Sequence, residues 1–303
     1  MKLAILSKGP GNYSTKRLKE EAEKSGHEVR VINYAKCYAK IAKSRPVVSF
    51  EGEDLSGFDA IIPRIASSYT RYGSAVVRQF EMQGIYTTAS SIAIVRSRDK
   101  LRTMQLLARA GVGIPKTVFS RGIVDAEDLI DEVGGTPVII KLARGTHGRG
   151  VVLAETKKAA KSALQGFYLM DEEGTNILLQ EFIEESAGQD IRAFVVGAQV
   201  VASMKRQSLD DDFRSNIHQG GTGSLIKLTN EEEKVAVKAA RAIGLSICGV
   251  DLMRSRRGPL VLEVNSSPGF AIEQVTGRNV AEKIIDYIEL NAKARRKKDR
   301  VGA

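Results

Sequence analysis

Cysteine is scarce in this chain: Cys37 and Cys248 are the only two among its 303 residues. Two cysteines can form neither the disulfide framework of a small secreted domain nor a four-cysteine zinc site. Long hydrophobic runs are also missing, since no stretch approaches the roughly 20 apolar residues of a membrane-spanning helix. Residues 1–12 are too short, and too soon broken by glycine, for a signal peptide. We therefore expect a cytoplasmic protein without membrane contact.

The sequence also lacks a dinucleotide-binding fingerprint. The glycine-rich segment SKGPGNYS, residues 7–14, joins an expected strand to an expected helix, but it has neither the GxGxxG spacing nor a matching acidic residue. We therefore expect a tight structural turn there. The chain has no internal repeat and no low-complexity tract, and its hydrophobic content of 43% is typical of a globular protein.

Positive charge is in excess, with a net charge of +10. Half of that excess lies between residues 293 and 300, which hold six basic residues and one acidic residue. Such a run is either a solvated helix end, where cations suit the helix dipole, or an electrostatic arm that contacts RNA, a ribosome or an acidic protein. The pattern alone favours neither interpretation.

The first 95 residues alternate between strand and helix patterns. Apolar or alternating runs predict strands, and amphipathic runs that end at glycine predict helices. The expected strands are 2–6, 27–34 and 58–65, and the expected helices are 13–26 and 74–84. This order of elements predicts a small open α/β domain.

The rest of the chain mixes helices with strands that follow one another directly. A helix is expected at 97–111 with Ser97 as its N-cap, and a hairpin turn is expected at 197–198. The other expected helices are 125–135, 156–167, 230–244 and 279–298, and the other expected strands are 136–141, 176–183, 190–207 and 258–265. The predicted class is α/β or α+β with mixed sheets.

A glycine-rich loop follows the apolar strand that ends at Lys141. Glycines let backbone amides approach anionic oxygens closely. This loop joins strand to strand, whereas a Walker loop or Rossmann turn opens a helix. It is either a flexible hairpin or a flap that closes over a triphosphate. The flap glycines would be Gly145, Gly148 and Gly150, and its basic residues Arg144, His147 and Arg149.

An acid–x–amide pair ends the apolar strand at 259–265. Glu263 and Asn265 are two residues apart and therefore project from the same face. A hairpin with the preceding strand would add Asp251 at the same end of the sheet. Two carboxylates and an amide oxygen are hard ligands that suit Mg²⁺. We therefore favour a metal site over an ordinary exposed sheet edge.

Two further segments carry weaker signals. Backbone groups at Glu181 and Phe182 could pair with an adenine edge, Asp190 with ribose hydroxyls, and Arg192 with phosphate. In residues 211–221, Arg214 and Asn216 alternate along an extended arm and could stabilise a transferring phosphoryl group. His218 on the same arm is not assigned a catalytic role, because a lone histidine is more often a surface residue.

These motifs together resemble those of ATP-grasp ligases, and in particular the RimK family of L-glutamate ligases. The resemblance is carried by Lys100 in RDK, by Lys141 before the glycine-rich loop, and by the segments QEFI, DIR, DFRSN and EVNSSPG. It extends from residue 1 to about residue 290.

The resemblance implies an ATP-grasp fold whose two later domains hold ATP between mixed or antiparallel sheets. The implied division is an N-terminal α/β domain at 1–95, a central domain at 96–179, a C-terminal domain at 180–290 and a basic tail at 291–303. ATP and two Mg²⁺ or Mn²⁺ ions are the implied cofactors. The implied nucleotide-binding residues are Lys100, Lys141, Glu181, Phe182, Asp190, Arg214, Ser215 and Asn216, and the implied metal ligands are Asp251, Glu263 and Asn265.

The resemblance also implies a reaction. ATP would phosphorylate a substrate carboxylate, and the amino group of L-glutamate would attack the acyl phosphate, with Lys141 and Arg214 as catalytic residues. The implied acceptor is the C-terminal glutamate of a small-subunit ribosomal protein, with poly-α-glutamate as a further product. The expected partners are this acceptor, L-glutamate, ribosome or RNA at the basic tail, and further copies of the chain in a homo-oligomer.

Two alternatives remain open at this point. A related ligase could act on a deazaflavin or pterin cofactor, or on an amino-group carrier protein. From another class, a basic RNA-binding module could retain an inactive nucleotide fold. The latter predicts RNA affinity that falls steeply with salt, without ATP turnover.

Overall fold

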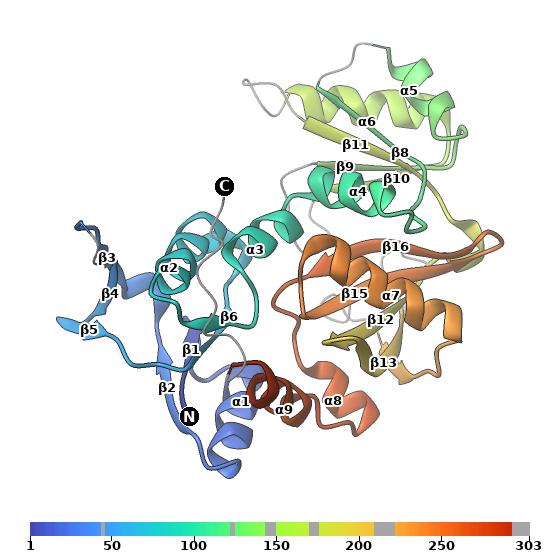
Figure 1. Ribbon diagram of the computed structural model, residues 1–303. Coiled ribbons are helices and arrows are strands. Elements are labelled where there is room, and N and C mark those ends of the chain that lie inside the picture. The colour runs from blue at the N-terminus through green and yellow to red at the C-terminus, as the bar shows by residue number, and fades with distance from the viewer. Residues whose placement is uncertain (44–45, 122–124, 143–149, 170–175, 209–221, 293–303) are drawn as a thin grey trace.

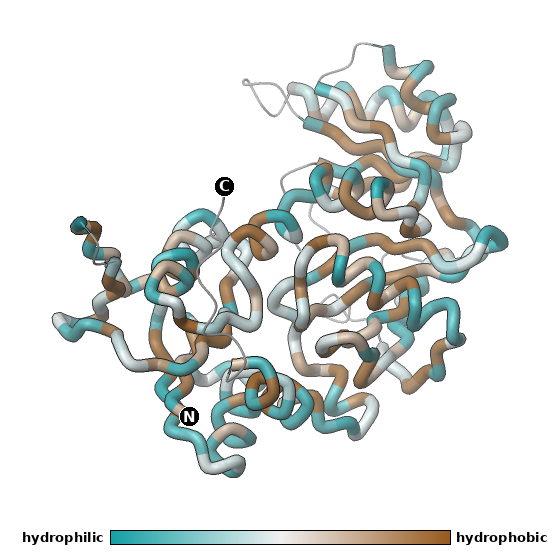
Figure 2. The backbone as a smooth tube through the Cα atoms, viewed as in Figure 1, coloured by the Kyte–Doolittle hydropathy of each residue, from teal (hydrophilic) through white to brown (hydrophobic). Residues whose placement is uncertain are grey.

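The computed structural model describes residues 1–43, 46–121, 125–142, 150–169, 176–208 and 222–292 (Figure 1). Within these residues the chain forms three sheets of four or five strands and a small sheet of three strands. Figure 2 shows that hydrophobic residues concentrate along the strands, while the helices alternate between hydrophobic and hydrophilic turns. No helix in the described ranges is both long and apolar enough to cross a bilayer.

The first sheet is parallel, with the strand order β2-β1-β6-β7. Leu3 and Ile5 of β1 face a core that includes α1 and α9, and Ala4 and Leu6 face a core that includes α2. Because both faces are covered, β1 reads as a continuous apolar run. The elements are β1 (Lys2–Ser7), α1 (Tyr13–Lys24), β2 (Glu28–Ile32), β6 (Ala60–Arg64), α2 (Thr70–Met82), β7 (Tyr86–Thr87) and α9 (Val280–Ala292).

A small antiparallel sheet, which the sequence did not predict, branches from this domain (Figure 1). It consists of β3 (Tyr38–Lys40), β4 (Val47–Phe50) and β5 (Glu53–Leu55), with the short 3₁₀ helices η1 (Tyr34–Lys36) and η2 (Ser67–Tyr69) nearby in the sequence. Strands of three or four residues are too short for an alternating pattern to stand out.

Two helices, not one, connect the first sheet to the second. They are α3 (Ser91–Arg98) and α4 (Lys100–Arg109). The expectation that Ser97 caps the second helix is wrong: Ser97 lies inside α3 and donates to the Ile94 carbonyl, while Asp99 accepts from the Arg102 amide as the N-cap of α4. Both residue types make good caps, and the break between the helices decides which one serves.

The second sheet is antiparallel, with the order β10-β9-β11-β8. Two helices pack on one face around Ile130, Ile140 and Leu179, so alternate residues of β9 face the other way. Lys141 is one of these residues, on the face of the sheet away from the two helices. The elements are β8 (Thr117–Arg121), α5 (Ala126–Glu132), β9 (Val138–Leu142), β10 (Val151–Ala154), α6 (Lys157–Leu169) and β11 (Asn176–Glu181).

The third sheet is also antiparallel, with the order β14-β13-β12-β15-β16. The expected turn at 197–198 joins β12 to β13, and Gly197 adopts a φ of 64° there. Helix α7 packs on this sheet and begins with a capping box between Thr229 and Glu232. The elements are η3 (Glu184–Ser186), β12 (Gln189–Val196), β13 (Gln199–Gln207), β14 (Thr222–Leu225), α7 (Asn230–Ile243), β15 (Ile247–Ser255), β16 (Gly258–Asn265) and α8 (Ala271–Thr276).

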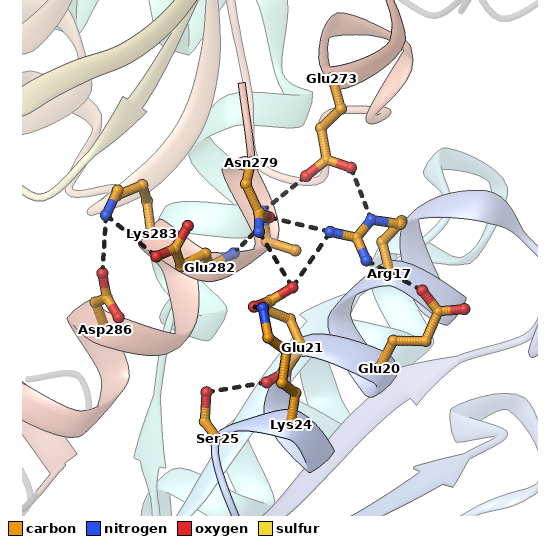
Figure 3. Close-up of polar contacts among 11 residues, drawn as sticks. Arg17, Glu20, Glu21, Lys24, Ser25, Glu273, Asn279, Glu282, Lys283 and Asp286 are labelled. Atoms are coloured by element: carbon orange, nitrogen blue, oxygen red, sulfur yellow. Dashed lines mark hydrogen bonds and ion pairs between the residues drawn. The ribbon is translucent and has the colours of Figure 1, made fainter. Parts of the chain in front are cut away.

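The C-terminal helices return to the N-terminal domain, where α9 packs against α1. Figure 3 shows Arg17 of α1 between Glu21 and Glu273, with Asn279 completing the contact. Arg17 Nε donates to Glu273 at 3.1 Å, and its Nη2 donates to Asn279 at 3.0 Å. The side chains of Glu21 and Glu273 are only 7% and 6% exposed. Arg17 therefore neutralises two buried carboxylates and ties α8 to α1.

We expect Arg17→Met to destabilise the protein by about 3 kcal/mol, because it leaves the buried Glu273 without its cation and leaves Glu21 with Lys24 alone. The matched control is Lys19→Met on the same helix. Lys19 pairs with Glu23 across two half-exposed side chains, so its loss should change the free energy of unfolding by less than about 0.5 kcal/mol. Denaturant titration measures both variants, and equal small effects would contradict the structural role of Arg17.

Candidate functional site

The strands β15 and β16 bring the three expected oxygen ligands together. Asp251 and Glu263 are directly paired across the hairpin, and Asn265 is paired with Gly249. Cross-strand partners share a face of the sheet, and so do residues two apart on one strand. Asn265 Nδ2 donates to Glu263 Oε1 at 2.8 Å, which leaves the Asn265 carbonyl oxygen for another partner. The acid–x–amide pattern therefore places two oxygen donors side by side.

Asp251 differs from the other two because it is buried in a cluster of arginines. It accepts from Arg192 Nε at 2.7 Å and from Arg192 Nη2 at 2.5 Å, and Arg206 Nη2 lies 2.8 Å away. Burial alone would raise the pKa of Asp251, but the two guanidiniums outweigh it and hold that pKa well below its usual range. Asp251 is thus charged and already bound.

Glu263 keeps 53% of its side chain exposed, yet its charge acts on groups from three parts of the chain. Loss of bulk water in this crowded region, and then the Asp251 charge, raise the pKa of Glu263, whereas the hydrogen bond from Asn265 lowers it. The Glu263 charge in turn favours the protonated forms of Arg98, Lys100 and Lys141. Glu263 is therefore the point where α3, α4 and β9 converge on β16.

Two lysines supply positive charge from the second sheet and the helix before it. Lys141 donates to Gln180 Oε1, and Lys100 Nζ donates to the Leu142 carbonyl at 2.9 Å. Burial, reinforced by the Lys100 charge, lowers the pKa of Lys141 to about 8. Burial also lowers the pKa of Lys100. Within the described residues neither lysine forms an ion pair with a carboxylate, although the Glu263 charge acts on both, so the two cations are suited to an anionic ligand.

The glycine-rich loop lies almost wholly outside the described residues, and with it Gly145 and Gly148. The strands that it joins, β9 and β10, are antiparallel neighbours as expected. Gly150 lies at the loop end of this strand pair. Its carbonyl accepts from the Leu142 amide at 2.9 Å, and its φ is 72°. Arg144, His147 and Arg149 also lie outside the described part of the chain.

The residues expected at the adenine and ribose already have protein partners. Glu181 accepts from the Lys116 amide at 2.6 Å and from Arg257, and its own amide donates to the Lys116 carbonyl at 3.0 Å. Phe182, next to it, is half-buried. Asp190 forms a buried two-point ion pair with Arg206. The nucleotide roles of Glu181, Phe182 and Asp190 stay predictions.

The segment 209–221 lies outside the described residues, so the structure places neither Arg214 nor Ser215 nor Asn216. His218 lies in the same segment. Their roles therefore also stay predictions.

The sequence interpretation missed Arg206 and assigned Arg192 to phosphate. Arg206 lies on β13 at a position where the alternation of buried residues, including Met204, points inward. A buried arginine on an apolar face requires an acid, and Asp190 and Asp251 are those acids. The alternation along β13 was the sequence signal that could have identified Arg206 as buried. Arg192 binds Asp251 in the structure.

The donor set fits Mg²⁺ in its chemistry. Within the described residues, no three histidine, cysteine or carboxylate side chains gather into a complete metal site. Mg²⁺ is usually bound through one or two carboxylates, with water and substrate phosphates completing the shell. Glu263 and the Asn265 carbonyl oxygen match this requirement. Asp251 could contribute only by giving up part of its contact with Arg192 or Arg206.

Comparison with known proteins agrees with this geometry. Residues 97–288 match the RimK-like ATP-grasp domain, and residues 1–94 match the RimK PreATP-grasp domain. A protein of Nitrosococcus oceani named probable alpha-L-glutamate ligase is 55% identical over 293 residues, 96% of each chain. A Vibrio cholerae protein of the same name is 54% identical over 301 residues, 99% of each chain.

Solved structures share the fold at lower identity. A RimK domain ATP-grasp protein from Sphaerobacter thermophilus superposes with a TM-score of 0.70 at 19% identity, covering 95% of this chain and 100% of its own. The ATP-grasp ligase PsnB, solved with a minimal precursor, Mg and ADP, gives a TM-score of 0.73 at 19% identity, covering 96% and 98%. The expected ATP-grasp fold, ligase class and family resemblance are confirmed: the chain belongs to the RimK-like ATP-grasp family of ATP-dependent ligases.

Proposed function

We propose that this ligase adds L-glutamate to the C-terminal glutamate of a small-subunit ribosomal protein, with ATP and two Mg²⁺ or Mn²⁺ ions. The observation that carries the proposal is the convergence of Lys100 and Lys141 on Glu263, beside Asn265. That arrangement pairs oxygen ligands for cations with cations for phosphate. The names of the relatives from Nitrosococcus oceani and Vibrio cholerae support glutamate as the added group.

The proposed reaction has two steps. An oxygen of the acceptor carboxylate attacks the γ-phosphorus of ATP, the bond to the bridging oxygen breaks, and ADP leaves. The amine of glutamate then attacks the acyl carbon, inorganic phosphate leaves, and a proton is released as the amide forms. No nucleophile from the protein is required, because the activated group is on the substrate.

The residues of the chain position charge during these steps. Lys100 and Lys141 would bind phosphate oxygens, and the positive charge of Lys141 would offset negative charge on the transferred phosphoryl group. Glu263 and Asn265 would hold the divalent ions, with Asp251 as a further ligand. Such ions, when bound, neutralise phosphate charge and orient the γ-phosphate. Arg214 would act on the same group, with Ser215 and Asn216 at the nucleotide. The flap of Gly145, Gly148 and Gly150 would cover the phosphates.

Acceptor identity is tested by mass spectrometry after incubation of the enzyme with ATP, glutamate and one candidate acceptor at a time. We expect a mass gain of one or more glutamyl residues on the ribosomal protein. A gain confined to a deazaflavin, a pterin or a carrier protein would overturn the acceptor assignment. ATP turnover with glutamate alone would instead support synthesis of poly-α-glutamate.

Four further expectations concern the chain as a whole. The basic run from 293 to 303, proposed to contact ribosome or RNA, lies outside the described residues. The chain is also proposed to act in the cytoplasm and to form a homo-oligomer. The division into domains at 1–95, 96–179 and 180–290 stays a prediction.

A further inference from the structure

Two arginines from the N-terminal half meet beside the loop that follows β16. Arg64 ends β6, and its Nη2 donates to the Pro268 carbonyl at 2.6 Å and to Ser14 Oγ at 3.1 Å. Its guanidinium lies 5.2 Å from the centre of the Phe270 ring. Arg64 is therefore held against the loop of residues 266–270. Ligands of open α/β sheets bind at this carboxyl end of parallel strands.

Arg98, the last residue of α3, comes close to Arg64. Its Nη2 donates to the Ile65 carbonyl at 2.9 Å, but its buried Nε has no hydrogen-bond partner within the described residues. The positive charge of Arg98 contributes, after burial, to lowering the pKa of Arg64 to about 10. Neither arginine has an ion pair with a carboxylate of the described part of the chain. Two like charges thus lie side by side without a carboxylate in direct contact.

The loop opposite adds two hydroxyls that are equally unsatisfied. Ser266 Oγ and Ser267 Oγ are buried and have no hydrogen-bond partner among the described residues. Ser266 is only 4% exposed. A buried polar group without a partner costs about 1–3 kcal/mol. Three such atoms beside an unneutralised pair of guanidiniums indicate a site shaped for an anion that carries oxygen atoms.

This position adjoins the proposed phosphoryl-transfer site without coinciding with it. Ser266 directly follows Asn265, and α3 packs against β16. The Glu263 charge acts on Arg98 as it does on Lys100 and Lys141. Lys141 lies on β9 of the second sheet and Lys100 begins α4, two residues after Arg98, whereas Arg64 ends β6 of the first sheet. The arginine pair therefore flanks the reaction centre on the side of the N-terminal domain.

We propose that Arg64, Arg98 and the hydroxyls of Ser266 and Ser267 bind a carboxylate of the incoming amino acid that is not changed in the reaction. This inference rests on the proposed ligase function. One carboxylate of the acceptor glutamate has to reach the γ-phosphate, which leaves only its side-chain carboxylate unchanged, whereas the incoming glutamate presents its amine and keeps both of its carboxylates. A carboxylate accepts paired hydrogen bonds from guanidinium groups, which give strong and directional binding. The site is thus a specificity determinant for the nucleophile.

The first test compares Michaelis constants of the full-length enzyme. Arg98→Met should raise the KM for glutamate about 10- to 100-fold, the loss expected for hydrogen bonds to a charged group, and leave the KM for ATP within about twofold. Arg98→Lys should recover part of the loss. Arg96→Met is the matched control, because Arg96 lies on the same helix, is half-buried and also has a buried Nε without a partner, but lies near Gly244. Its KM for glutamate should not change.

A second variant tests the site without removing a charge and without destabilising the protein. Ser266→Ala combined with Ser267→Ala removes two unsatisfied hydroxyls, so the free energy of unfolding should stay equal or rise, while the KM for glutamate rises. Glutamine and isoglutamine each replace one of the two carboxylates of glutamate by a neutral amide. Their use as substrates shows which carboxylate the site binds. One of them should be a much poorer substrate for the wild type, and this penalty should disappear in Arg98→Met.

The outcomes separate this inference from the proposed function. A wild type that uses no glutamate would refute the proposed function. A wild type that uses glutamate, with an unchanged KM for glutamate in Arg98→Met and in the double serine variant, would refute the carboxylate site alone. An increase confined to the KM for the acceptor would also overturn it, since the arginines would then bind the acceptor.

Discussion

Glu263→Gln is expected to lower the rate of ligation by about 10²–10³-fold or more, the loss typical when one electrostatic contact to the transition state is removed. Glutamine preserves the size of the side chain and the contact with Asn265, but it removes the charge that acts on Lys100 and Lys141 and that is proposed to bind a divalent cation. The rate of ADP formation with saturating ATP, glutamate and acceptor measures the effect. Excess Mg²⁺ should not restore the wild-type rate.

The control for this variant is Glu184→Gln, since Glu184 is exposed in η3 of the same domain. It should retain the wild-type rate, and both variants should keep the wild-type denaturation midpoint, because Glu263 is half-exposed. Asp251→Asn is a poorer probe. It would disturb a buried cluster with Arg192 and Arg206 at a cost of about 3–5 kcal/mol, so that lost activity could reflect lost stability. Full activity of Glu263→Gln would contradict the site.

Lys141→Met is expected to lower kcat/KM for ATP by about 10²-fold or more, because it removes a buried cation from the position proposed for the γ-phosphate. In the enzyme without nucleotide, the pKa of Lys141 is lowered to about 8. Below that pH the lysine is charged and ready to bind phosphate. The wild-type kcat/KM for ATP should therefore decline as pH rises from 7 to 9, and Lys141→Met should lack this component.

The exposed Lys158→Met on α6 is the control and should show the wild-type pH profile. The lowered pKa of Lys141 also predicts how the free energy of unfolding varies with pH. Between pH 8 and the ordinary lysine value of 10.5, the unfolded chain binds more protons at this position than the folded chain. The free energy of unfolding therefore gains a contribution that rises with pH across this interval. A wild-type profile for ATP that is flat from pH 7 to 9, with Lys141→Met parallel to it, would contradict the role of Lys141.

The sequence predicted the elements whose patterns are long and regular. The strands β1, β6, β9 and β16 follow from apolar runs, and α1, α7 and α9 follow from helical periodicity. The short turn between β15 and β16 predicted a hairpin that brings Asp251 to the same end of the sheet as Glu263 and Asn265. The turn alone would place Asp251 opposite Leu262, but a β-bulge between Asp251 and Leu252 shifts the register by one residue and pairs Asp251 with Glu263.

Other features could not be predicted because they depend on contacts between segments far apart in the sequence. The alternation of buried residues on β13 marks Arg206 as inward, but only the fold shows that its partners are Asp190 and Asp251. The meeting of Arg64 with Arg98 depends on the hydrogen bond that Arg98 donates to Ile65, the residue after β6. The break between α3 and α4 replaced Ser97 by Asp99 as the cap. Local pattern therefore identified most of the strands, and tertiary packing determined how their charges are paired.

The central claim is that side-chain oxygens on β16 hold divalent ions beside the γ-phosphate. The most direct measurement is the number of Mn²⁺ ions bound per chain, determined by electron paramagnetic resonance in the presence of a non-hydrolysable ATP analogue. We expect two ions on the wild type and fewer on Glu263→Gln, with no change for Glu184→Gln. Equal binding of Mn²⁺ by all three proteins would place the ions elsewhere and contradict the account.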